Sequence, residues 1–197
     1  MDILQTITQE FNLNPTHAKN ILSLIDEGNT IPFIARYRKE MTGSCDDQVL
    51  RALFDRLTYL RNLEKRKEEV SSAIGEQGKL TDEIKAALEK AVTLTEVEDI
   101  YRPYKQKRKT RASVAVAKGL QPLADAILAQ DKALDVRREA EKYITEEVKT
   151  ADEAIAGAQD IIAEIISDDA ATRKKIRNFF FNHGEIASSY VKGKEAE

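Results

Sequence analysis

Residues 46–74 read DDQVLRALFDRLTYLRNLEKRKEEVSSAI, a run that contains neither glycine nor proline. The run predicts one long helix, about 43 Å in length at about 1.5 Å per residue. In the first half, apolar side chains recur at helical spacing and form one stripe, namely Leu50, Leu53, Phe54, Leu57, Leu60 and Leu63. Beyond Leu63 only Val70 and Ile74 continue this stripe, so the second half of the helix is either mostly solvated or packs against something narrow.

Three shorter helices are predicted on the N-terminal side of this run. The first covers residues 2–11. Asn14 can cap the second helix with Pro15 at its first position, and Gly28 can end it in the left-handed conformation. The third includes Tyr37 and is followed by a break at Thr-Gly-Ser-Cys. Three short helices joined by tight turns resemble a helix-turn-helix unit.

Helical patterns also dominate the chain after residue 76. Thr150 opens the most apolar helix, and a last helix is predicted over residues 170–182. No run alternates with the strand period for long enough to build a sheet. The residues that these two helices are predicted to bury include Ile161, Ile162, Ile165, Ile166, Ile176, Phe179 and Phe180.

The predicted fold class is therefore all-α and multi-helical. Residues 1–75 form a helix-turn-helix-like unit plus the long helix, and residues 76–184 form a second helical subdomain. Residues 185–197 form an extended, polar tail. Hydrophobic residues make up 42% of the 197 residues and charged residues 33%, which favours a packed core over disorder.

Composition also indicates a cellular setting. The single cysteine, Cys45, excludes an internal disulfide, and a reducing, cytoplasmic location is expected. No stretch approaches the roughly 20 apolar residues that a membrane span needs.

One segment is basic in a chain whose net charge is −3. Residues 101–119 contain seven Lys or Arg and no Asp or Glu. Dense positive charge on an extended loop can contact phosphates, and tyrosines beside it can stack on unpaired bases. The alternative is a loop that pairs with this chain's own acidic segments or with another domain. The candidate residues are Arg102, Tyr104, Lys105, Lys107, Arg108, Lys109 and Arg111, in a loop over residues 103–112.

A second basic cluster, Arg36, Arg38 and Lys39, lies on the predicted third helix. In a helix-turn-helix protein such residues reach phosphates or base edges. The alternative is an ordinary solvated helix face, because helix triplets are common in proteins with structural roles.

Nothing in the sequence predicts catalysis. His17 and His183 have no Cys or carboxylate at the spacing of metal ligands, and a zinc site needs about four ligands. Gly-rich phosphate loops and nucleophile motifs are also missing from the sequence. We expect no catalytic residue, no metal and no cofactor.

A set of short segments lies along most of residues 1–184. These segments are IPFIARYRKE (31–40) with Thr42-Gly43, Leu57 with YLRNLE (59–64), EQGKLT (76–81), EDIY (98–101), PYK (103–105), KRKTRA (107–112), and KGL (118–120) with PLA (122–124). Together they resemble, in the family's order, the N-terminal region of the Tex family of bacterial transcription accessory proteins. Arg102 and Gln106 depart from the family pattern, which tends to read an apolar residue and proline there, and Gln106 leaves the loop less stiff.

The resemblance implies a function. Members of the family are longer and carry an RNase H-like domain, helix-hairpin-helix elements and an OB-fold that reads RNA. The resemblance therefore implies that this chain is the helical scaffold of an RNA-binding transcription accessory factor. Residues 102–111 would form an auxiliary surface for RNA or DNA.

A protein-docking module is the alternative function. Its partners would be RNA polymerase or ribosome-associated proteins. The docking surface would be the exposed end of the long helix, around residues 61–70, and it would depend on Leu63, Val70 and Ile74.

Overall fold

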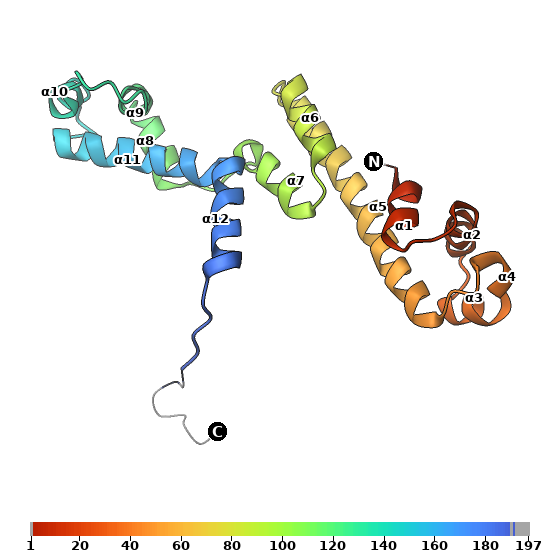
Figure 1. Ribbon diagram of the computed structural model, residues 1–197. Helices are drawn as coiled ribbons and strands as arrows, with labels where there is room; N and C mark the ends of the chain where they lie inside the picture. The colour runs from red at the N-terminus through yellow and green to blue at the C-terminus, as the bar shows by residue number, and fades with distance from the viewer. Residues whose placement is uncertain (1, 190, 192–197) are drawn as a thin grey trace. The chain divides into compact units, whose positions relative to one another are not determined.

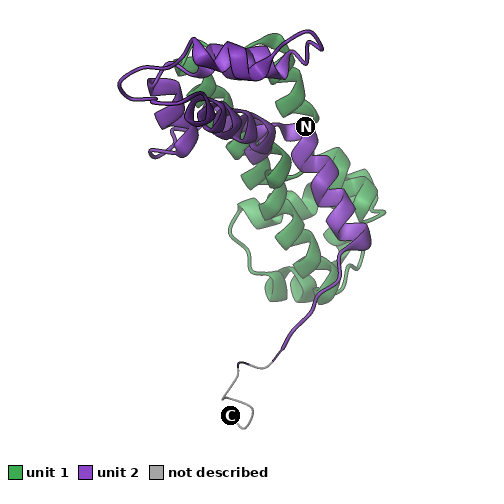
Figure 2. Ribbon diagram, turned by 90° about the vertical axis from the view of Figure 1, so that its left-hand side faces the viewer, with its two compact units in different colours: residues 1–97 green, residues 98–197 purple. Residues whose placement is uncertain are grey.

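The computed structural model describes residues 2–189 and 191. Across these residues it contains twelve α-helices, one 3-10 helix and no strand, so the all-α prediction is confirmed (Figure 1). The chain forms two compact units, Met1–Val97 and Glu98–Glu197, and the division falls inside α7 (Leu94–Tyr101) (Figure 2). The division predicted after residue 75 stays a prediction, and the structure groups α6 (Asp82–Lys90) with the helices before it.

Polar side chains cap the N-termini of several helices in unit 1. The Asn14 side chain accepts a hydrogen bond from Thr16 N, with Pro15 in the first turn, as predicted. Gly28 follows the second helix with a φ of 81°, the left-handed conformation that glycine adopts without strain. A helix-turn-helix arrangement of the first helices stays a prediction. The helices before α6 are α1 (Ile3–Glu10), α2 (Pro15–Asp26), α3 (Ile31–Tyr37), α4 (Lys39–Thr42) and α5 (Asp47–Glu76).

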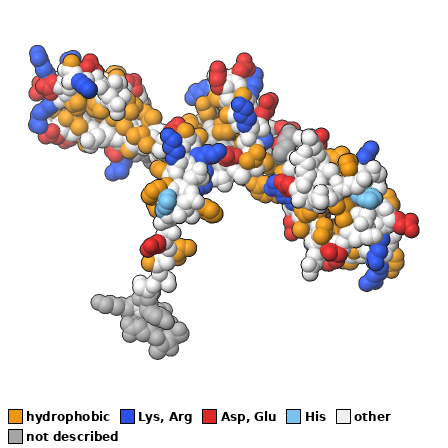
Figure 3. Space-filling model, viewed as in Figure 1, with side chains coloured by type: hydrophobic (Ala, Val, Ile, Leu, Met, Phe, Trp, Pro, Cys, Tyr) orange, Lys and Arg blue, Asp and Glu red, His pale blue; other side chains and the backbone are white. Residues whose placement is uncertain are grey.

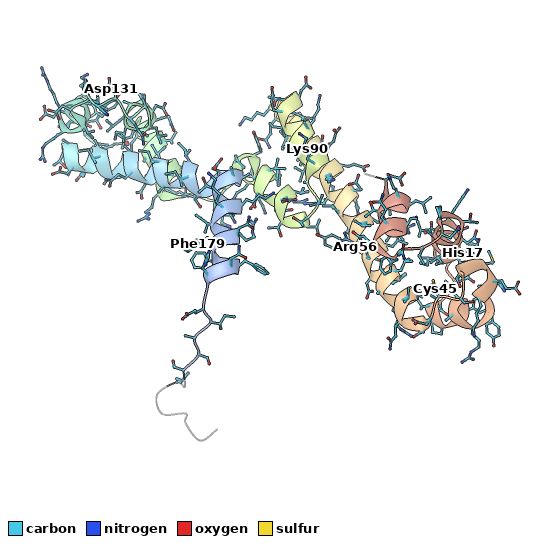
Figure 4. All side chains as sticks on the ribbon, in the orientation of Figure 1. His17, Cys45, Arg56, Lys90, Asp131 and Phe179 are labelled. Atoms are coloured by element: carbon cyan, nitrogen blue, oxygen red, sulfur yellow. The ribbon has the colours of Figure 1, made fainter. Side chains whose placement is uncertain are left out.

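The first half of α5 carries the core of unit 1. Its leucines lie against the apolar faces of α1, α2 and α3, while Phe54 points outward and is exposed. An ion pair between Arg56, labelled on α5 in Figure 4, and Glu10, with 2.6 Å between Nη2 and Oε1, also joins α5 to α1. The buried cluster consists of Ile7, Ile21, Leu24, Ile34, Leu50, Leu53, Leu57 and Leu60.

The second half of α5 is covered by a narrow partner. After a turn at Gly78, helix α6 packs back on α5, and Leu63, Val70 and Ile74 are fully buried. Lys67 is also buried, and its ammonium donates to the carbonyl of Glu89 at 3.2 Å. Of the two alternatives predicted for this end of α5, solvation or packing against something narrow, the structure thus shows the packing. The prediction that Leu63, Val70 and Ile74 form an exposed docking surface is wrong, because all three side chains are fully buried.

Unit 2 is built around α11 (Ala151–Asp168). Gly157 allows close packing there, because a Cβ at this position would overlap the Leu120 side chain. The other elements are η1 (Arg102–Tyr104), α8 (Arg111–Ala117), α9 (Gln121–Leu128), α10 (Val136–Glu141) and α12 (Ala170–His183). The core consists of Ala112, Ala115, Leu120, Leu123, Ala124, Ala140, Val148, Ala151, Ala154, Ala158 and Ile161.

Apolar side chains remain exposed on α12 and on the end of α11. Figure 3 shows hydrophobic side chains along α12. The prediction that they are buried is wrong, because α12 packs through Arg173 and Arg177 instead of through its apolar residues. The exposed residues are Ile165, Ile166, Ile176, Phe179, Phe180 and Phe181.

The chain has no regular element after α12 in residues 184–189 and 191. The rest of the predicted polar tail, residues 192–197, lies outside the described residues. No helix in the described part of the chain is both long enough and apolar enough to cross a membrane.

Candidate nucleic-acid interface

The basic segment of unit 2 is a short loop fixed at both ends. Pro103 lies in η1, directly after α7, and the loop proper covers residues 105–110. Thr110 then opens α8 with a reciprocal cap. Its hydroxyl accepts from Ser113 N at 3.0 Å, and the Ser113 hydroxyl accepts from Thr110 N at 2.9 Å. The loop is therefore shorter than the predicted extended segment 103–112.

Three of the six cations in residues 102–111 pair with an acidic row on α11. Arg102 Nε lies 2.8 Å from Asp168 Oδ1, and Lys107 Nζ contacts both Asp168 and Glu164, the latter at 3.2 Å. Arg111 Nε lies 3.5 Å from Asp160 Oδ1. The three acids are four residues apart, so they lie on one face of the helix. For these three cations the structure shows the intramolecular pairing that the sequence left open.

The pairing keeps Lys107 charged. Burial lowers the pKa of its ammonium, but hydrogen bonds to Asp168 and Glu164 outweigh burial, so the pKa is raised. The Asp168 side chain is only 10% exposed and has two cationic partners. Arg102, Lys107 and Asp168 therefore anchor the loop.

The other three cations, Lys105, Arg108 and Lys109, are exposed. None of them forms an ion pair with another residue in the described part of the chain. A groove of about 530 Å³ lies between the loop and α11, and Asp160 and Glu164 line it together with the basic residues. Carboxylates inside the groove repel an anion there, so a phosphate binds more favourably at the outer edge of the loop. Tyr104 is half-buried beside the loop.

A buried acid that the sequence did not single out fixes α12 within unit 2. Asp99 accepts from Arg173 Nε at 2.7 Å and from Arg177 Nη2 at 2.5 Å. Burial raises the pKa of the Asp99 carboxyl, but the two guanidinium hydrogen bonds outweigh burial, so the pKa is lowered. In the sequence, Arg173 and Arg177 are one helical turn apart, which indicates that they share a helix face. This spacing does not identify Asp99 as their partner.

The second basic cluster lies where α3 meets α4 in unit 1. Arg38 interrupts the two helices, and its guanidinium lies 5.1 Å from the centre of the Phe33 ring. The ring of Tyr37 lies 5.3 Å from that of Phe33. Arg36 and Lys39 are exposed and form no ion pair with any residue that the structure describes. The cluster thus combines available positive charge with aromatic rings.

Two contacts hold α4 against α2. The Asn20 side chain donates to the carbonyl of Met41 at 3.0 Å. Gly43, which follows α4 with a φ of 66°, lies so close to His17 that a Cβ would overlap the imidazole ring (Figure 4 labels His17 on α2). The basic cluster is therefore presented on a fixed support.

Two family models match the chain. Residues 1–75 match the Tex-like protein N-terminal domain, and residues 131–197 match the Tex central region-like family.

Curated relatives match along nearly the whole chain. The uncharacterized protein YdcI of Bacillus subtilis (strain 168) is 50% identical over 195 residues, which cover 98% of this chain and 27% of the relative. The transcriptional accessory protein Tex of Neisseria gonorrhoeae is 44% identical over 197 residues, which cover 100% of this chain and 26% of the relative. The S1 RNA-binding domain-containing protein 1 of Homo sapiens is 33% identical over 181 residues, which cover 90% of this chain and 18% of the relative. The chain thus spans about a quarter of the length of the bacterial relatives.

Proposed function

The chain belongs to the Tex family, and from this premise we propose that it is the helical scaffold of a transcription accessory protein with an auxiliary surface for nucleic acid. The surface is the outer edge of loop 105–110, and RNA is its expected ligand. Two relatives support this proposal by name, one as a transcriptional accessory protein and one as an S1 RNA-binding domain-containing protein. The proposed location is cytoplasmic.

The observation that carries the proposal is the division of the cations in residues 102–111 into two sets. Arg102, Lys107 and Arg111 pair with the acids of α11, and Arg102 and Lys107 fix the loop through Asp168. Lys105, Arg108 and Lys109 stay exposed without a carboxylate partner in the described residues. Ordering the loop in advance lowers the conformational entropy that its free cations lose when they bind phosphates.

The expected affinity is modest and independent of sequence. Three cations can neutralise about three phosphates, which predicts a log–log salt slope of about −2 for a single strand. The loop offers no row of side-chain amides for reading base edges. Loop 105–110 would therefore position the protein on nucleic acid and leave sequence selection to other sites.

Catalysis is not part of the proposal. Burial, and to a smaller extent Asp46, raises the pKa of the Cys45 thiol, so this side chain stays protonated and is a poor nucleophile. A nuclease assay of the purified chain that showed turnover removed by a point substitution would contradict this part of the proposal.

The test measures binding of a fluorescent single-stranded RNA by anisotropy over a salt series. The variant Lys105→Glu/Arg108→Glu/Lys109→Glu reverses the three free cations and leaves the three paired cations in place. The matched control, Lys132→Glu/Arg138→Glu/Lys149→Glu, makes the same charge change at exposed positions elsewhere in unit 2. We expect the loop variant to bind RNA more weakly and with a shallower salt slope, and the control to keep most of the wild-type affinity.

Two outcomes would contradict the proposal. Equal losses in both variants would mean that only net charge matters. Unchanged binding by the loop variant would mean that loop 105–110 does not contact RNA.

One observation favours a second candidate function, protein docking. Hydrophobic side chains on α12 are exposed, and Phe181 is 89% exposed. A partner such as RNA polymerase or a ribosome-associated protein would then bind α12 and not the buried residues of α5. Substituting Phe179 and Phe181 by serine would weaken such a complex and leave RNA binding unchanged.

A further inference from the structure

An exposed tyrosine stands among basic residues of the sequence at the junction of α3 and α4. We define the α3–α4 tip as residues 36–41, which contain three basic residues and one acid, Glu40. Tyr37 is 60% exposed although it is a large aromatic residue. Arg36 and Lys39 flank it in sequence without a carboxylate partner in the described residues. Figure 3 shows Lys and Arg side chains gathered at this end of unit 1.

The rings of Phe33 and Tyr37 form a tilted pair, with 46° between the ring planes, and Tyr37 is its exposed member. The guanidinium of Arg38 covers Phe33 at 5.1 Å, and Phe33 contacts Tyr37 with 5.3 Å between ring centres. Phe33 is half-buried, so it supports Tyr37 from the protein side. A supported ring loses little conformational entropy when another flat group stacks on it.

The tip is poorly suited to reading duplex DNA. In a helix-turn-helix protein the N-terminal residues of the recognition helix contact base edges in the major groove. Here α3 has only 7 residues, and the first four, Ile31 to Ile34, are apolar and cannot donate side-chain hydrogen bonds. The cations lie at the other end of α3 and on α4, where they can reach a backbone.

We propose that the α3–α4 tip binds single-stranded nucleic acid by stacking an unpaired base on Tyr37, with Arg36 and Lys39 on the flanking phosphates. Aromatic stacking accepts any base, because every base has a π face, and nearby cations track the backbone. In a duplex the bases are already stacked on each other, so Tyr37 distinguishes single strands from duplexes. This site lies in unit 1 and is independent of loop 105–110.

The support under the tip explains how so short a helix presents a fixed surface. Asn20 of α2 holds the carbonyl of Met41, and Gly43 packs against His17. Both contacts come from α2, which is itself part of the core of unit 1 through Ile21 and Leu24. The tip is therefore attached to the core by a polar and a steric contact.

The experiment compares a short fluorescent oligouridine with a blunt DNA duplex, by anisotropy at low salt. Tyr37→Ala removes the ring, Tyr37→Phe keeps it, and Phe54→Ala removes a different exposed aromatic from unit 1 as the matched control. We expect Tyr37→Ala to weaken single-strand binding about 5- to 150-fold, the range that corresponds to one stacked base. Tyr37→Phe and Phe54→Ala should stay within about twofold of the wild type, and Tyr37→Ala should leave duplex binding within the same range.

The proposal is overturned if Tyr37→Ala binds the single strand like the wild type, as it would if the tip served a protein partner. It is also overturned if Tyr37→Phe loses as much as Tyr37→Ala, or if duplex binding falls equally. Repeating the Tyr37 series in the Lys105→Glu/Arg108→Glu/Lys109→Glu background separates the two sites. A Tyr37 effect that persists there supports the tip even if the loop proposal fails. Weaker binding by the loop variant, with no further loss from Tyr37→Ala, supports the loop proposal and contradicts the tip proposal.

Discussion

Arg102 Nε lies 2.8 Å from the carboxylate of Asp168, a residue 66 positions later in the chain. The same carboxylate contacts the ammonium of Lys107. One nearly buried acid at the end of α11 thus holds the basic loop on both sides of Lys105. The loop's conformation therefore depends on a helix that is remote in sequence.

Replacing Asp168 by asparagine should release the loop. We expect the free energy of unfolding to fall by about 1–2 kcal/mol, less than for a fully buried pair because Arg102 remains partly hydrated. Trypsin should also cleave faster after Lys107 and Arg108, because an unanchored loop enters a protease more easily. Urea titration and timed digestion measure the two effects.

The matched control for Asp168 is Asp152→Asn on the same helix. Asp152 lies 3.4 Å from Arg137, and both side chains are about 70% exposed. An exposed pair of this kind contributes little, so the unfolding free energy should change by less than about 0.5 kcal/mol. Equal effects of the two substitutions would show that Asp168 does not anchor the loop.

Asp99 should make stability depend on pH in the acid range. Its pKa is lowered in the folded protein because Arg173 and Arg177 outweigh burial, so the unfolded chain binds the proton more tightly. The stabilisation is complete above the unfolded pKa of about 3.9 and is lost as pH falls through the lower folded value. Asp99→Asn should therefore be less stable at pH 7 and lose less stability below about pH 4. Urea midpoints from pH 7 to pH 3 test this, and parallel curves would contradict it.

The sequence predicts the helices well because their signals are local. The absence of glycine and proline over residues 46–74 predicted α5, and Asn14-Pro15 predicted the start of α2. Caps and breaks act within a few residues, so one sequence contains them entirely.

Burial and site geometry were harder to predict because they depend on partners far along the chain. The apolar spacing of Ile176 and Phe179 indicates a helix face, but it does not indicate which element covers that face. Charge counts located the basic loop correctly, yet they could not show that Lys107 binds Glu164 and Asp168 while Lys105 stays free. Contacts between residues that are 57 or more positions apart in the sequence follow from packing and not from a local pattern.

Gly43 should be less replaceable than another glycine of the same backbone conformation. Gly43 and Gly78 have φ values of 66° and 67°, but a Cβ at Gly78 meets nothing within 4 Å, whereas one at Gly43 overlaps His17. Gly78→Ala should cost about 1–2 kcal/mol from backbone strain alone. Gly43→Ala should cost more, and His17→Ala in the same chain should remove the excess. Thermal unfolding of the wild type and the three variants tests this, and equal costs at the two glycines would contradict it.

The acidic row on α11 should weaken the basic loop's binding to RNA. Asp160 and Glu164 line the groove beside the free cations, so their charges reduce the local positive potential that attracts phosphates. Asp160→Asn/Glu164→Gln keeps the side-chain shapes and leaves Asp168 to anchor the loop. We expect single-stranded RNA to bind about 3- to 10-fold more tightly at low salt, with the gain shrinking as salt screens the charges. The control Asp152→Asn/Glu146→Gln removes two exposed acids elsewhere in unit 2 and should gain less than about twofold. An equal gain in the control would attribute the effect to net charge, and no gain in either would mean that phosphates do not approach this face.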